Sequence, residues 1–176
     1  TTFSVTLTGS NTVYVNGAYD ISTATYVQNF SVLSQENAPS GIVFNNDGTK
    51  MYVIGTTGDD VNEYNLSTAF DVSSASYVQS FYVGSQEDNP MGMTFNNNGT
   101  KMFILGDAGN DVNEYNLSTA FDVSTASYVQ TFTVGSQETN PQGIAFNNDG
   151  TKMFITGYNG DDVNEYILSS AFDVST

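Results

Sequence analysis

The stretch "GIVFNNDGTKMYVI", from Gly41 to Ile54, places two short apolar runs on either side of a turn. A pair such as Asp47-Gly48 favours the tight turn of a β-hairpin, because glycine readily adopts the backbone conformation that these turns need. The second run is apolar at successive positions, which indicates a strand covered on both faces. The stretch therefore predicts two antiparallel strands joined by a hairpin turn.

The same pattern recurs along the chain with a period of 51 residues, so that Phe44, Phe95 and Phe146 occupy equivalent places. In the first period, "VNEYNL" (61–66) and "YVQSFYV" (77–83) predict a third and a fourth strand. Helical periodicity is absent. Four strands in a period of this length predict an all-β repeat protein.

The third period stops early. It provides predicted strands at 143–146, 152–155 and 163–168, and the printed sequence ends before a fourth. A segment that matches the fourth strand, "ATYVQNFSV" (Ala24 to Val32), precedes the first period instead. Because the sequence does not open with Met, we interpret it as a mature or truncated product.

The stretch "PQGIAFNNDGTKMFITG" (141–157) resembles the inner two strands of blades in WD40-like and YVTN-type β-propellers. The continuation "EYNLSTAFDVSTASYVQTFTV" (114–134) is similar to propeller repeats of secreted bacterial proteins and of phage or marine viral appendages. The resemblance implies four-stranded antiparallel blades, three per chain, over residues 18–176. Residues 1–17 are expected to form extra strands that serve assembly. A sandwich and a parallel β-helix are the alternative folds, and both fit the strict period less well.

The composition limits the function. Acidic residues number nineteen against three basic ones, and histidine and cysteine are absent, which leaves a net charge of −16. Such a chain repels nucleic acid and anionic lipid, and it contains no apolar run long enough to insert into a membrane. Without histidine or cysteine the usual general bases and nucleophiles are missing. We therefore predict no enzymatic activity and no catalytic residue, with a carboxylate-based hydrolase or lactonase as a minor alternative.

Blade geometry places the fourth-to-first connections and the second-to-third turns on one face, and most differences between the copies fall there. We therefore expect any ligand on this face. Tyr158 has no aromatic counterpart in the other copies, and the acids could contact a cation. Calcium stays a secondary candidate because the calcium-loop spacing is lacking, so no metal or cofactor is assigned. The candidate ligand residues are Glu87, Asp107, Asp111, Glu138, Tyr158 and Asp162.

Three blades are fewer than the four of the smallest propeller rings. We therefore predict strand exchange between subunits, in which Ala24 to Val32 of one protomer completes the third blade of the next. The contact would join copies head to tail, in a ring or a filament. The residues expected to make it are Tyr26, Val27, Phe30 and Val32 on one side, and Val163, Tyr166 and Leu168 on the other.

These features together predict a non-enzymatic structural or adhesive protein outside the cell, on a cell-surface filament or a virion appendage. Its expected partner is itself, with surface glycans as a second candidate. The alternative is a lectin-like or calcium-dependent propeller that binds through several weak sites at once.

Overall fold

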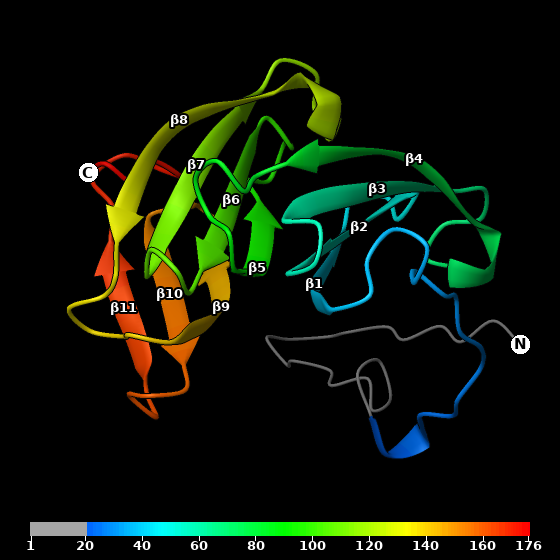
Figure 1. Ribbon diagram of the computed structural model, residues 1–176, viewed down its shortest axis with the longest axis horizontal. Helices are drawn as coiled ribbons and strands as arrows, with labels where there is room; N and C mark the ends of the chain where they lie inside the picture. Colours follow the sequence, from blue (N-terminus) through cyan, green and yellow to red (C-terminus); the bar gives the residue numbers. More distant parts are fainter. Residues whose placement is uncertain (1–20) are drawn as a thin grey trace, which may run out of the picture.

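The computed structural model describes residues 21–176, so the predicted assembly segment 1–17 lies outside the described residues. Three antiparallel sheets follow one another along the chain and stand side by side (Figure 1). The first sheet contains β1 (Pro39–Phe44), β2 (Lys50–Gly55), β3 (Asp60–Leu66) and β4 (Ala75–Tyr82). The second contains β5 (Pro90–Phe95), β6 (Lys101–Gly106), β7 (Asp111–Leu117) and β8 (Ala126–Thr133). The third contains β9 (Pro141–Phe146), β10 (Lys152–Gly157) and β11 (Val163–Ile167).

The strands within each sheet are ordered as in the sequence, which confirms the predicted blades. Short 3₁₀ turns complete the described part of the chain: η1 (Ile21–Thr23), η2 (Val72–Ser74) and η3 (Val123–Thr125). No helix in residues 21–176 is long and apolar enough to cross a membrane.

The predicted hairpin turn joins β1 to β2. The Oδ1 atom of Asp47 accepts hydrogen bonds from the N–H and the hydroxyl of Thr49 at 3.0 and 2.6 Å. Gly48 has φ of 71°, and a Cβ atom there would lie 2.3 Å from the ring of Phe70. The aromatic ring therefore closes over the turn, and only glycine leaves room for it.

The first strands of the three sheets lie next to one another, with β5 between β1 and β9. A Cβ atom on Gly41 would lie 3.5 Å from the Cα of Gly92, which shows how closely the backbones approach. Farther out, aromatic rings join neighbouring sheets: the centroid of Phe81 lies 5.6 Å from that of Tyr115 in an edge-to-face contact. The core is therefore made between sheets, by one apolar cluster at each of the two interfaces.

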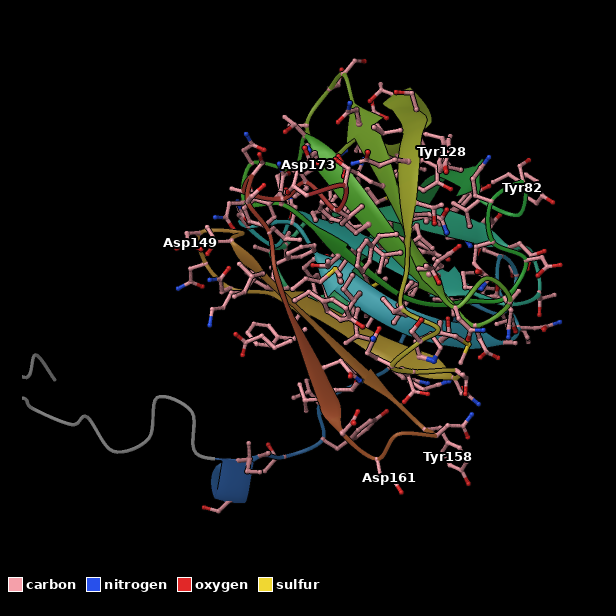
Figure 2. All side chains as sticks on the ribbon, turned by 90° about the vertical axis from the view of Figure 1, so that its left-hand side faces the viewer. Tyr82, Tyr128, Asp149, Tyr158, Asp161 and Asp173 are labelled. Carbon is pink, nitrogen blue, oxygen red and sulfur yellow. The ribbon has the colours of Figure 1, made fainter. Side chains whose placement is uncertain are left out.

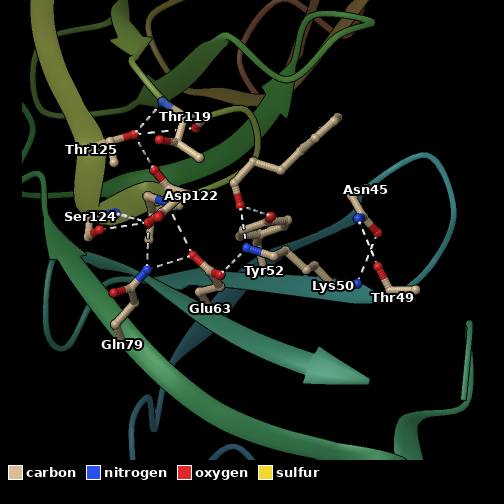
Figure 3. Close-up of polar contacts among 12 residues, drawn as sticks. Asn45, Thr49, Lys50, Tyr52, Glu63, Gln79, Thr119, Asp122, Ser124 and Thr125 are labelled. Carbon is tan, nitrogen blue, oxygen red and sulfur yellow. Dashed lines mark hydrogen bonds and ion pairs between the residues drawn. The ribbon is translucent and has the colours of Figure 1, made fainter. Parts of the chain in front are cut away.

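A buried carboxylate joins the first two sheets (Figure 3). Glu63 is 1% exposed, and Lys50 Nζ lies 2.6 Å from its Oε1 atom. Its Oε2 atom accepts hydrogen bonds from Gln79 Nε2 at 3.0 Å and from the N–H of Val123, in the turn η3 between β7 and β8, at 3.1 Å. Lys50 also donates to the carbonyl of Phe121 at 2.9 Å. Charge pairing and backbone contacts together fix one sheet against the next.

The same network recurs between the second and third sheets. Glu114 accepts from Lys101 at 2.6 Å, from Gln130 at 2.8 Å and from the N–H of Val174 at 3.2 Å. In the third sheet Glu165 keeps its lysine, Lys152 Nζ, at 2.6 Å, but its side chain is 47% exposed. The carboxylate is thus buried only where a fourth strand and a following sheet cover it.

Replacing the buried carboxylate should be costly. We expect Glu114→Ala to lower the free energy of unfolding by about 3–5 kcal/mol, because Lys101 would keep a partly buried charge without its partner. The control Asp88→Ala removes an exposed carboxylate and should change stability by about 0.5 kcal/mol or less. Urea unfolding followed by circular dichroism measures both, and equal losses in the two variants would contradict the network's role.

The hairpin turns give a second prediction. Gly99, which is equivalent to Gly48, has φ of 70° and would place a Cβ atom 2.3 Å from the ring of Phe121. Gly99→Ala should therefore destabilise the fold by at least about 1–2 kcal/mol, from backbone strain alone. Asn98→Asp, which installs the residue found in the other two copies, is the matched control. A thermal midpoint for Gly99→Ala within error of the parent would show that the ring can move away.

Candidate functional site

The two ends of the sheets carry different loops, as predicted. Figure 2 shows Tyr158 and Asp161 at one end of the third sheet and Asp149, in the hairpin turn, at the other end. The first of these ends, which we call the variable end, comprises the connections before β1, β5 and β9 and the turns after β2, β6 and β10. The candidate ligand residues all belong to these loops or to the first residue of a third strand.

Two candidates, Glu87 and Glu138, are buried within the loops of the variable end. Glu87 Oε1 accepts from the N–H groups of Asn89 and Ala108 at 2.7 and 3.1 Å, and Oε2 accepts from that of Gly109 at 3.1 Å. Glu138 is held in the same way, and its bond from the N–H of Gly160 is the main cause that lowers the pKa of its carboxyl. These carboxylates shape the variable end by tying each connection to a turn.

The candidate Asp111 is the first residue of β7, and the candidate Asp162 directly precedes β11. Asp111 is half-buried, accepts from Asn113 Nδ2 at 2.7 Å, and lies opposite Thr133 of the outer strand β8. Burial raises the pKa of Asp111 above its ordinary value. Asp162 is exposed and accepts from Asn164 Nδ2 at 2.8 Å. Both therefore lie toward the outer half of the sheets, away from the adjacent first strands.

The remaining candidates, Asp107 and Tyr158, occupy equivalent places directly after the second strands. Their backbone N–H groups donate to the carbonyls of Asn89 and Asn140 at 3.1 and 3.0 Å, so the two residues sit in the same backbone frame. The first sheet holds Thr56 in this frame. One constant backbone position thus presents a hydroxyl, a carboxylate and a phenol in turn.

These side chains differ in their surroundings. Asp107 is half-buried, and Asn89 Nδ2 donates to its Oδ2 atom at 3.1 Å, which orients the carboxylate. Tyr158 is 75% exposed. In the part of the chain that the structure describes, no three histidine, aspartate or glutamate side chains gather closely enough to hold a metal ion. The side chains of the variable end offer hydrogen bonding, proton transfer to a carboxylate and stacking on an aromatic ring.

The residues predicted to mediate assembly are not brought together within one chain. The segment Ala24 to Val32 lies beside the first sheet, and β11 forms the far edge of the third (Figure 1). In the single chain the segment does not form the predicted strand. Tyr26, Val27 and Val163 are 82%, 79% and 64% exposed. The others are partly or fully buried: Phe30 and Val32 against the first sheet, and Tyr166 and Leu168 between the second and third sheets.

No family model matches the sequence, and a search of curated proteins finds no match either. Solved structures do match. The periplasmic gluconolactonase PpgL of Pseudomonas aeruginosa superposes with a TM-score of 0.55 at 16% identity, over 73% of this chain and 35% of that one. A candidate 6-phosphogluconolactonase from Bacteroides fragilis gives 0.58 at 12% identity, over 73% and 34%.

A propeller that is not named as an enzyme matches as well. The β-propeller domain of Cps50 (Swd1) from Myceliophteria thermophila gives a TM-score of 0.51 at 12% identity, over 76% of this chain and 40% of that one. The chain thus spans between a third and two fifths of the length of the structures it matches. At these identities the similarity concerns the fold.

The comparison corrects the predicted function. The chain was expected to be a non-enzymatic structural or adhesive protein, because its blades repeat and histidine and cysteine are absent. That prediction is wrong, since proteins named as lactonases share the arrangement of blades. The expected location outside the cell stays a prediction. The similarity to solved propellers and the sequential strand order within each sheet agree on one conclusion: the chain has a β-propeller fold.

Proposed function

We propose that the chain contributes three blades to a propeller that hydrolyses a small lactone at the variable end. One observation carries the proposal: the residue after each second strand keeps its backbone position while its side chain changes from Thr56 to Asp107 to Tyr158. Turns that serve only the fold tend to keep their residues, and the hairpin turns at the opposite end differ between copies only in Asn98 in place of an aspartate. A varied set of polar groups on a constant frame is suited to contacts with an asymmetric small molecule.

Asp107 is the residue to which we assign proton transfer. In lactone hydrolysis, water adds to the ring carbonyl and the bond between the acyl carbon and the ring oxygen breaks. A carboxylate can take the proton from the attacking water and return it to the departing alkoxide, which leaves a hydroxy acid. Asn89 holds one oxygen of Asp107, and we assign the other oxygen to the water. No histidine is needed for this step.

The side chain of Tyr158 and the net charge of the chain indicate which kind of lactone would bind. The exposed ring of Tyr158 offers a flat apolar surface on which the face of a sugar-derived ring can stack, with a hydroxyl at its edge. The net charge of −16 repels phosphorylated substrates. We therefore propose a neutral lactone. The gluconolactonase PpgL among the structural neighbours supports this class, and the rest of a complete ring would supply further contacts.

The proposal is tested on the 176-residue chain by recording acid release from a neutral aldonolactone in a pH-stat. Asp107→Asn should reduce the rate above the spontaneous background by about 10²–10⁴-fold, the usual contribution of a general base. The control Asp149→Asn alters an acid at the opposite end, where the second copy already carries Asn98, and should leave the rate unchanged. Equal rates for Asp107→Asn and the parent chain would refute the assignment.

A further inference from the structure

We infer that the free edge of β11 is completed by residues 24–32 of a second copy of this chain, and that two copies close a ring of six blades. The inference concerns the partner of the sheet edges and does not depend on the proposed lactone hydrolysis. It rests on two surfaces at opposite ends of the row of sheets. Together they carry the residues that form the interface between neighbouring sheets within the chain.

The acceptor half is the outer edge of the third sheet. In the first sheet β4 covers β3, with Val61 opposite Phe81 and Glu63 opposite Gln79, and Val61 is fully buried. Val163 is the equivalent of Val61, but it is 64% exposed because no described strand pairs with the outer edge of β11. An exposed edge with an apolar side chain favours the addition of a strand.

The donor half is the segment Ala24 to Val32. It carries the fourth-strand sequence, and its side chains already make the contacts that a fourth strand makes with the following sheet. Gln28 Nε2 donates to Asp71 at 2.5 Å, as Gln79 does to Asp122 at 2.8 Å. Phe30 meets Tyr64 edge to face with centroids 5.6 Å apart, as Phe81 meets Tyr115. The segment thus occupies the place of a fourth strand from a preceding sheet.

The polar network shows which residues would pair. Gln79 binds two carboxylates, Asp122 of the next sheet and Glu63 of its own. Among the described contacts, Gln28 binds Asp71 but no glutamate. Glu165 accepts from Lys152 but from no glutamine. Shifting the β3–β4 register by whole repeats places Gln28 of one copy opposite Glu165 of the other. It also places Phe30 opposite Val163.

The apolar surfaces are complementary in the same sense. At the first complete interface, Tyr52 and Ile54 of one sheet pack against Met102 and Ile104 of the next. The outer face of the first sheet holds a cavity of about 340 Å³ whose lining includes Met51 and Val53. These two residues are equivalent to Met102 and Ile104. On the outer face of the third sheet, Phe154 and Thr156 line a smaller hollow. These two residues are equivalent to Tyr52 and Ile54.

Closure with two copies follows from counting blades. The 176-residue chain carries one donor segment, Ala24 to Val32, and one acceptor edge, at β11. Copies of it can therefore join head to tail, and such a contact forms a ring when the rotation closes. Two chains supply six blades, within the range of four to eight that propellers use. In this ring each copy completes the third sheet of the other, and the outer faces of the first and third sheets become interior.

The inference is tested by measuring the molar mass of the full 176-residue chain by light scattering after gel filtration. The parent chain should have twice the 18.9 kDa of one copy. Val163→Asp places a charge at a position that becomes buried on pairing, so this variant should have the mass of one copy. Because Val163 is exposed in the single chain, the Val163→Asp variant should keep the circular dichroism spectrum of the parent chain.

The chain offers a matched control at the same strand edge. Ile167 is 76% exposed, but its equivalents Asn65 and Asn116 stay exposed in the completed sheets. Ile167→Asp should therefore keep the mass of two copies. A parent chain with the mass of one copy, a mass beyond two copies, or equal dissociation of both variants would overturn the inference. None of these outcomes bears on lactone hydrolysis, which Asp107→Asn tests separately.

Discussion

A buried carboxylate on each third strand organises the packing of the blades. Removing a charge from water is costly unless the charge is paired and hydrogen-bonded, so Glu63 requires its lysine, its glutamine and a backbone N–H from the neighbouring sheet at the same time. These groups come from β2, from β4 and from the 3₁₀ turn η3 of the neighbouring blade. Apolar packing alone tolerates sliding, whereas this arrangement of donors permits one relative position. The angle between blades therefore depends on it.

The strands and turns could be predicted from the sequence because they depend on local properties: alternation of apolar residues, Asp-Gly turns and a strict period. The bounds were less accurate where a local rule is broken. β1 begins at Pro39, two residues before the predicted start, because an irregular register at Pro39 and Gly41 extends the pairing with β2. The buried network could not be predicted, since Lys50 and Glu63 show their connection to Val123 only after the sheets have packed.

At the variable end, too, some features could be predicted from the sequence and others could not. Tyr158 is exposed there, where the differences between copies placed it. Glu87 and Glu138 also lie in these loops, but the sequence does not reveal that backbone N–H groups enclose their carboxylates. An acid that recurs in every copy is more readily explained by the fold that all copies share. Asp107, which occurs in one copy, is better placed to serve a function that the other copies do not.

The matching registers of β3 with β4 and of β7 with β8 have a consequence for how the chain folds. During folding β3 can pair with β8 almost as favourably as with β4, because the two fourth strands carry nearly the same residues. Chain connectivity decides between them. The correct partner follows after eight residues, 67–74, while the wrong one requires a far longer loop to close. The short connection therefore acts as a kinetic guide, and a longer one would allow misassembled blades to accumulate.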